Sequence, residues 1–342
     1  MSLLSPPPHH LLPSSDHQPE PRLGPDPVLS RWTSAEELRE GARDLALDLV
    51  PLRLEGGGFG GETLTVELPP LRLVRFRVWG RVHSMGRKPK GVLALSLDLD
   101  PLPEVGHWRS HGQVLPMHCL FGHDVNRDIH ITLPARANLG MVFFPIEALR
   151  PWASRLGWPG FDGELLPRAN VHLMDLDSAT GLRRLLRQIF TMAEHSPASP
   201  RRPATQRLFQ EDLIPLLLEA LINGPAETKR PPARIGMVKD AQRWMHDHPT
   251  QPITLAELCH QAHVSRRTLI QGFRDHLGMG PMAYLKILRL HGIRRQLLRA
   301  DPARTQIAPL AGEWGFHNPG HFAADYRRLF GERPRDTLRG VG

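Results

Sequence analysis

A short stretch of the sequence, SRRTLIQGFRDHLG at residues 265–278, combines side chains that can recognise nucleic-acid bases with an apolar stripe. If the stretch is helical, Leu269 and Phe273 share one face at 100° per residue and turn inward. In the DNA major groove, arginine pairs with guanine, glutamine pairs with adenine, and isoleucine can contact a thymine methyl group. The stretch therefore predicts a helix that reads DNA bases, with an ordinary solvated amphipathic helix as the alternative. The candidate base-reading residues are Arg267, Gln271 and Arg274 on the outward face, flanked by Thr268 and Ile270.

The residues before this stretch complete the pattern of a helix-turn-helix. Thr254, with Glu257 three residues later, forms the capping-box pattern that begins a helix. Ser265 can cap the next helix, and Gly278 can end it. Val264 lies in the short connection, where it can fill the angle between the two helices. Two short helices joined in this way place the second one in a major groove.

The same pattern occurs a second time after a long helix. PMAYLKILRLHGIRRQLLRA predicts a helix over about 281–299, roughly 27 Å long at about 1.5 Å per residue. That length is close to the turn of B-DNA, roughly 34 Å, that separates successive major-groove faces. TQIAPLAGEWGF and NPGHFAADYRRLFGERP then predict a second unit. The two candidate recognition helices cover about 265–276 and 318–330.

The two candidate recognition helices differ in their outward residues. Gly320 and Ala324 place small side chains on the second helix. We therefore expect the first helix to read bases and the second to bind mainly the phosphate backbone. The candidate phosphate contacts are Arg266 and Thr254 in the first unit, and His317, Asn318, His321, Arg327 and Arg328 in the second.

Charge is distributed unevenly along the chain. The formal net charge is +8, and residues 234–342 hold 17 Lys and Arg against 9 Asp and Glu. The entire excess of positive charge therefore lies in the last third of the chain. A basic segment attached to a neutral one indicates a polyanionic partner, although a merely solvated basic surface gives the same count.

Residues 235–338 resemble the DNA-binding domain of the AraC/XylS family of bacterial transcription regulators. The resemblance implies a sequence-specific DNA-binding regulator that inserts two recognition helices into successive major grooves. WGF followed by FAADYRRLFGERP is similar to regulators of the ethanolamine-operon type. The residues that carry the family resemblance are Leu258, Ser265, Leu269, Phe273 and Gly278 in the first unit, Tyr284, Arg289 and Leu290 in the long helix, and Ile307, Leu310, Ala311, Gly315, Phe316, Phe322, Tyr326, Arg327, Gly331 and Pro334 in the second unit.

These patterns predict an α+β fold class and divide the chain into four parts. Residues 1–27 are rich in Pro, His and Ser and predict a disordered tail. Residues 28–223 predict a β-rich, cupin- or jelly-roll-like regulatory domain with flanking helices, because short alternating runs fill about 50–145. Residues 224–233 predict a linker. Residues 234–342 predict an all-α domain in which a long helix joins two helix-turn-helix units.

The function of the front domain stays open at this point. The family resemblance implies that the domain senses an effector or mediates dimerisation. The alternative is a regulator without a small ligand, controlled by its abundance or by a protein partner. The partner that this interpretation implies is double-stranded DNA, while RNA polymerase, a small-molecule effector and a second copy of the chain remain open. The sequence does not decide between activation and repression.

An enzyme, a cofactor and a metal site are not expected. A DNA-repair enzyme with the same DNA-binding module would hold a nucleophilic cysteine on zinc through further cysteines, and the chain has only Cys119 and Cys259. A group of histidines lacks metal-ligand spacing and is predicted to be scattered over surface and loops. This group consists of His107, His111, His118, His123 and His130. The lack of a secretory-signal pattern and of an apolar run of membrane-spanning length predicts a cytoplasmic, nucleoid-associated protein with no membrane partner.

Overall fold

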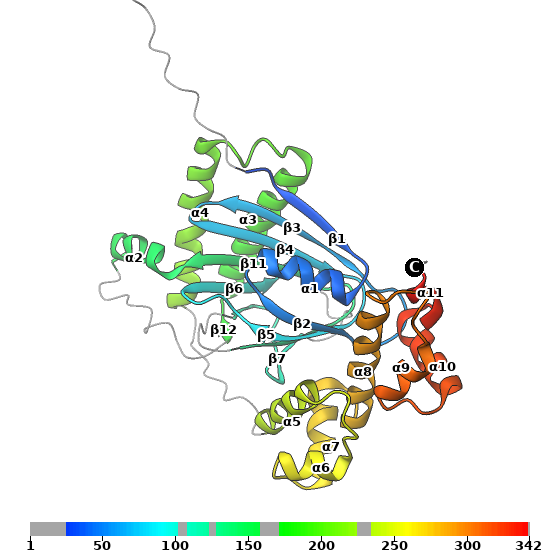
Figure 1. Ribbon diagram of the computed structural model, residues 1–342. Helices are drawn as coiled ribbons and strands as arrows, with labels where there is room; N and C mark the ends of the chain where they lie inside the picture. Colours follow the sequence, from blue (N-terminus) through cyan, green and yellow to red (C-terminus); the bar gives the residue numbers. More distant parts are fainter. Residues whose placement is uncertain (1–24, 102–107, 123–127, 158–170, 224–233, 341–342) are drawn as a thin grey trace, which may run out of the picture.

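The computed structural model describes residues 25–101, 108–122, 128–157, 171–223 and 234–340. Figure 1 shows a β-rich N-terminal domain and a smaller helical C-terminal domain, as the sequence predicts. Within the described ranges, none of the helices has the length and apolarity that crossing a bilayer requires. The predicted linker at 224–233 and nearly all of the predicted tail lie outside the described residues, as do His107 and His123.

The N-terminal domain contains two antiparallel sheets. In spatial order, the larger sheet contains β1 (Val28–Trp32), β3 (Gly61–Leu68), β4 (Leu71–Val78), β11 (Asn138–Pro145), β6 (Val92–Asp98), β9 (Cys119–Phe121) and β12 (Val171–Leu173). The smaller sheet contains β2 (Asp48–Arg53), β5 (Val82–Arg87), β10 (Ile129–Leu133), β7 (Arg109–Ser110) and β8 (Gln113–Val114). Every described strand pair is antiparallel.

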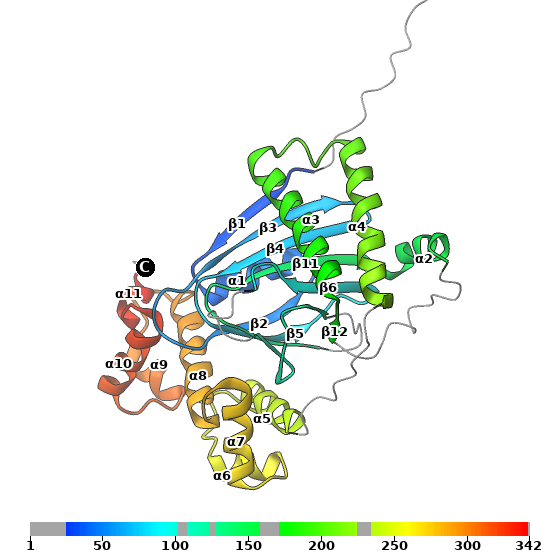
Figure 2. The same ribbon diagram turned by 180° about the vertical axis from the view of Figure 1, so that it is seen from behind.

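The two faces of the larger sheet have different neighbours because side chains alternate along each strand. On β3, Leu64 and Val66 belong to the apolar core under two long helices, α3 (Leu176–His195) and α4 (Pro203–Asn223). Figure 2 shows these two helices lying across that face of the sheet. The intervening residues Thr63 and Thr65 line a cavity on the opposite side. The larger sheet therefore separates a packed core from an open space.

This cavity has a volume of about 440 Å³ and lies between the two sheets. A short helix, α1 (Ala35–Asp44), contributes Leu38 and Ala42 to its lining. Ser34 caps this helix by accepting a hydrogen bond from the Glu37 N–H at 3.2 Å. A further helix, α2 (Ile146–Arg155), follows directly after β11.

The C-terminal domain is all helical. Its elements are α5 (Ile235–Asp247), α6 (Leu255–Gln261), α7 (Arg266–Leu277), α8 (Pro281–Leu297), α9 (Ile307–Glu313), α10 (Pro319–Phe330) and α11 (Pro334–Leu338). The central α8 is two residues shorter than predicted, and its 17 residues span about 25 Å. It connects the first unit, α6 and α7, to the second unit, α9 and α10 (Figure 1).

Sequence patterns missed the outer strands of the larger sheet. The strand β1 lies before the predicted β region, and four of its five residues are exposed, so it has no apolar alternation to detect. The other edge strand, β12, is only three residues long. The N-cap of α3 is Asp175, whose side chain accepts from the Ser178 N–H at 2.8 Å. A carboxylate at this position satisfies the same free N–H groups that a serine would.

Candidate DNA-binding surface and ligand cavity

The first helix-turn-helix unit begins with a complete capping box. Thr254 Oγ1 accepts from the Glu257 N–H at 3.2 Å, and Glu257 Oε2 accepts from the Thr254 N–H at 2.6 Å. Ser265 caps α7 by accepting from the Thr268 N–H at 3.2 Å. Gly278 ends α7 at a φ of 73°, a left-handed conformation that glycine adopts without steric cost. These sequence predictions are confirmed.

The base-reading candidates lie on the solvent side of α7. Leu269 and Phe273 are fully buried against α5, α6 and α8. Arg266, a candidate phosphate contact at the start of the helix, is exposed as well. Base reading itself stays a prediction, but the orientation it requires is present. Arg267, Gln271 and Arg274 are exposed, and Thr268 and Ile270 are half-buried beside them.

One of these candidates is oriented by its own helix. The Gln271 Nε2–H donates to Asp275 Oδ1 at 2.7 Å, and the other Asp275 oxygen lies 3.5 Å from Arg234 Nη1. An amide nitrogen has two hydrogens, so one remains for a base while the amide oxygen still accepts. Asp275 therefore fixes the amide of Gln271 in an orientation that suits bidentate contact with adenine. Asp275 is not among the predicted site residues, although its spacing of four residues from Gln271 along a helix is the spacing at which side chains interact.

The second unit repeats this architecture with different surface chemistry. Asn318 caps α10 by accepting from the His321 N–H at 3.0 Å, and Gly331 ends it at a φ of 81°. Phe322 and Tyr326 are buried on its inner face. Burial raises the pKa of Tyr326 to about 12, so its hydroxyl stays protonated.

The outward residues of α10 border a basic groove. This groove has a volume of about 470 Å³. Three arginines line it, Arg327 on α10, Arg333 just before α11 and Arg335 on α11, and the rest of its lining is apolar side chains of α9, α10 and α11. By contrast, Arg328 Nη2 pairs with Asp325 at 2.6 Å. Arg333 and Arg335 are not among the predicted phosphate contacts, because they lie beyond the second candidate recognition helix. Arginines on both sides of Pro334 were the signal available in the sequence.

The remaining candidate phosphate contacts differ in how easily a phosphate group could reach them. His317, Asn318 and His321 are exposed around the start of α10. The Thr254 hydroxyl, by contrast, already accepts from the Glu257 backbone and donates to the Glu257 carboxylate at 3.0 Å. A phosphate would have to displace that carboxylate to reach the hydroxyl.

A close packing contact fixes the second unit on α8. A Cβ atom added at Gly292 would lie 2.0 Å from the ring of Trp314. The Trp314 Nε1–H donates to Gln296 Oε1 at 2.8 Å, one turn further along α8. Only glycine lets this indole lie directly on the helix, so the spacing between the two units depends on Gly292.

The cavity between the sheets is the main candidate for a small-molecule site. Its wall is largely aliphatic and aromatic, and its volume falls in the usual range for ligand sites, roughly 300–1,000 Å³. Cations at its border already have partners: Arg72 pairs with Glu67, Arg31 lies 3.8 Å from Glu62, and the Lys88 Nζ donates to the Gly122 carbonyl at 2.6 Å. The lining therefore suits an apolar, uncharged molecule better than an anion.

Two of the predicted surface histidines are in fact buried. His111 and His130 are 5% and 3% exposed, and their rings stack at 5.9 Å beside the C-terminal domain. The sequence could not show this, because their burial depends on contact with α5. His118 is half-buried, with Nδ1 3.2 Å from the Arg183 guanidinium. In the described part of the chain, no cluster of three or more His, Cys, Asp or Glu side chains could hold a metal ion.

Comparisons with known proteins give the same assignment for the C-terminal domain. Residues 258–340 match the family model of a helix-turn-helix domain. A probable thc operon regulatory protein of Rhodococcus erythropolis is 34% identical over 174 residues, which are 49% of this chain and 52% of the relative. A XylDLEGF operon transcriptional activator 1 of Pseudomonas putida is 29% identical over 244 residues, 68% of this chain and 72% of the relative.

Among solved structures, a probable AraC family transcriptional regulator from Rhodopseudomonas palustris CGA009 is 34% identical. The match covers 31% of this chain and 97% of that chain, with a TM-score of 0.29. The chain spans about half the length of the first curated relatives it matches. The similarity to regulators of the ethanolamine-operon type stays a prediction. With two capped helix-turn-helix units on one connecting helix, and with the sequence matches over it, the C-terminal domain of the chain is a helix-turn-helix domain of the AraC/XylS family.

Proposed function

We propose that the chain is a sequence-specific DNA-binding transcriptional regulator, controlled by a small molecule bound between the sheets of its N-terminal domain. The observation that carries the DNA-binding proposal is α7, which buries Leu269 and Phe273 while it exposes Arg267, Gln271 and Arg274. Side chains of these types, spaced along one helix face, can read base edges in a major groove. The basic groove beside α10 suits phosphate, so the two units take different roles.

Selection of random duplex DNA with the full chain tests this proposal. We expect an enriched sequence with two half-sites about 10 base pairs apart, one helical turn. The affinity for the selected duplex should fall steeply with salt, with a log–log slope of roughly −5 if about six phosphates are contacted. Failure to bind any duplex at low salt would rule out the DNA-binding function.

Replacing Arg327 by Ala is expected to weaken binding to all sequences alike. Arg327 borders the basic groove with Arg333, and loss of one phosphate contact should reduce the salt slope by about 1. The measurement is the affinity for the selected duplex and a scrambled duplex over a salt series. The matched control is Arg328→Ala, because Arg328 already pairs with Asp325 and should change binding less. A change in the preferred sequence with Arg327→Ala would contradict the proposed division of roles.

The proposed effector is an apolar, largely uncharged small molecule. This class follows from the wall of the cavity, where Leu38, Phe76 and Met141 are among the apolar residues and the cations have partners. Thermal denaturation of the full chain with a panel of aromatic and aliphatic compounds should reveal a ligand that raises the melting temperature. A ligand at 100 times its Kd stabilises a folded protein by about 2.7 kcal/mol. If no compound in the panel stabilises the chain, control by abundance or by a protein partner is favoured.

The remaining partners also belong to the proposal. RNA polymerase and a second copy of the chain are candidate partners by family membership. A DNA-repair enzyme is not supported, because Cys119 is buried and its Sγ lies 3.1 Å from the Pro116 carbonyl, while Cys259 packs against the core of the first unit. A regulator of this kind would act where the DNA is, at the nucleoid.

A further inference from the structure

The two helix-turn-helix units pack on different halves of α8. Leu285 and Leu288 of α8 belong to the apolar core of the first unit, whereas Ile293 and Leu297 belong to that of the second. Within the described residues, the two cores have no buried residue in common. The angle between α7 and α10 therefore depends on α8 and on whatever else touches both units.

Within the C-terminal domain, Arg289 reaches from α8 to both units. Its Nε–H donates to the Pro249 carbonyl, between α5 and α6, at 2.8 Å. On the other side, a Cβ atom added at Gly315, in the turn of the second unit, would lie 2.8 Å from Arg289 Nη1. An arginine side chain has much rotamer freedom to lose, so alone it restrains the two units only loosely.

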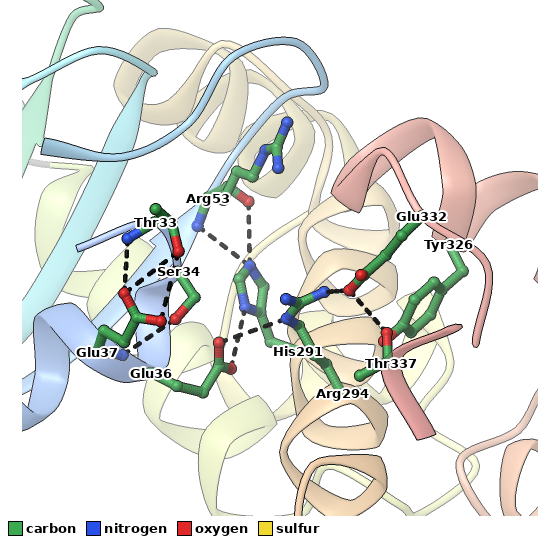
Figure 3. Close-up of polar contacts among 10 residues, drawn as sticks. All are labelled: Thr33, Ser34, Glu36, Glu37, Arg53, His291, Arg294, Tyr326, Glu332 and Thr337. Atoms are coloured by element: carbon green, nitrogen blue, oxygen red, sulfur yellow. Dashed lines mark hydrogen bonds and ion pairs between the residues drawn. The ribbon is translucent and has the colours of Figure 1, made fainter. Parts of the chain in front are cut away.

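A strand of the N-terminal domain meets α8 and the first unit. β2 is an edge strand of the smaller sheet, and the Arg53 N–H donates to His291 Nε2 on α8 at 3.1 Å. In the neutral ring Nδ1 then carries the proton, and it faces Glu36 Oε1 of α1 at 3.8 Å (Figure 3). Leu52 and Leu54, on either side of Arg53, are buried in the core of the first unit. The end of β2 is therefore part of that core and also reaches α8.

The loop after β2 continues to the second unit. The Arg53 guanidinium donates to the carbonyls of Glu55 and Gly57 and so holds the loop in place. Between them, Gly56 lies against the last turn of α10, where an added Cβ atom would overlap the Arg328 carbonyl oxygen. Only glycine allows so close an approach. Because the contact is with the backbone of α10, it cannot be relieved by rotating a side chain of that helix.

The first recognition helix has a matching contact at its own end. Arg81 Nη2 donates to the carbonyl of Leu277, the last residue of α7, at 2.9 Å. A cation is favourable at this end of a helix. The Arg81 carbonyl in turn accepts from the Leu54 N–H at 3.3 Å. The ends of α7 and α10 are therefore held from two hydrogen-bonded segments of one domain. We name residues 52–57 together with Arg81 the brace.

We propose that the brace fixes the distance and angle between α7 and α10 and thereby sets the half-site spacing that the full chain accepts. The proposal rests on the proposed function and names what determines its specificity for spacing. One inserted base pair shifts the second half-site by about 3.4 Å and turns it by about 35° around the duplex. The two units can follow that change only by moving relative to each other. In the braced chain this movement breaks buried contacts, which is costly.

The test compares two glycines of the same loop in the full chain. Gly56→Ala places a methyl group against the Arg328 carbonyl, whereas Gly58→Ala, the matched control, adds one in open space. Arg81→Ala removes the contact with α7, and its control, Arg87→Ala, removes an exposed arginine of the same sheet. The measurements are the affinities for the selected duplex and for the same duplex with one base pair inserted between the half-sites, at one salt concentration.

For the unmodified chain, the inserted base pair should weaken binding by about tenfold, comparable to the effect of one mismatched base pair. In Gly56→Ala and Arg81→Ala, this spacing penalty should fall by at least about threefold, because the units are free to adjust. The two controls should keep the penalty of the unmodified chain. A contact that only stabilised the fold would leave the ratio of the two affinities unchanged.

A second measurement reports on the brace without DNA. Spin labels on Ala256→Cys in α6 and Glu313→Cys in α9, both exposed, give the distance between the units, in a Cys259→Ala background. We expect a narrow distance distribution in the braced chain. The distribution should become broader or displaced in Gly56→Ala and Arg81→Ala.

An unchanged spacing penalty in both variants would overturn the proposal. An unchanged distance distribution in both would overturn it as well. If the chain bound no duplex, the proposed function would be refuted instead, and the distance distribution would still decide whether the brace holds the two units.

Discussion

Replacing Arg267 and Gln271 together by Ala is expected to remove most of the sequence preference of DNA binding. Each lost base contact should cost about 1–3 kcal/mol on the selected duplex. Both side chains are exposed on α7, opposite the buried Leu269 and Phe273, so their removal leaves the helix core intact. Affinity for a scrambled duplex should fall less, and only because the positive charge of Arg267 is lost. The measurement is the ratio of the two affinities at one fixed salt concentration.

A matched control separates base reading from charge. Arg299→Ala removes an exposed arginine after α8, outside both candidate recognition helices. It should leave the ratio of the two affinities unchanged. Asp275→Ala should reduce the preference at the base that Gln271 contacts, because it frees the amide that Asp275 holds at 2.7 Å. If the double variant weakens both duplexes equally, α7 contacts only the backbone and the assignment of base readers is wrong.

The C-terminal domain was predictable because its signals are local. Thr254 with Glu257, Ser265 and Gly278 mark the ends of short helices within a few residues of each other. The exposed and buried faces of α7 follow from helix geometry alone. Arg333 and Arg335 were missed because the groove that unites them with α10 forms only when α11 folds back.

For the N-terminal domain, only the fold class could be predicted from the sequence. Alternating runs indicate strands, but the order of strands in the two sheets depends on pairings between distant segments, such as Val74 with Met141. The cavity could not be predicted for the same reason. Nor could the burial of His130, which looks like one of several loop histidines until Gln242 of the other domain bonds to it. Contacts between domains leave no periodic signal in either segment.

Acidification from about pH 6.5 to about pH 4 is expected to destabilise the folded chain strongly. Burial lowers the pKa of His130 from 6.5 to about 4, and that of His246 to about 4. Burial also lowers the pKa of His83 well below its ordinary value. In this pH window these histidines bind protons in the unfolded chain but stay neutral in the folded chain. The stabilisation is therefore complete above pH 6.5 and is lost as the pH falls toward 4. For His130 alone the full loss is about 3 kcal/mol.

Urea denaturation of the full chain at about pH 7 and about pH 4.5 measures this loss. In His130→Gln, the new amide can still donate to Gln242 Oε1 but cannot take up a proton. We expect its free energy of unfolding to fall by about 2–3 kcal/mol less than that of the unmodified chain between these two pH values. The control His195→Gln, at the exposed end of α3, should follow the unmodified chain. If His130→Gln loses as much stability in acid as the unmodified chain, a neutral His130 bonded to Gln242 does not hold the two domains together.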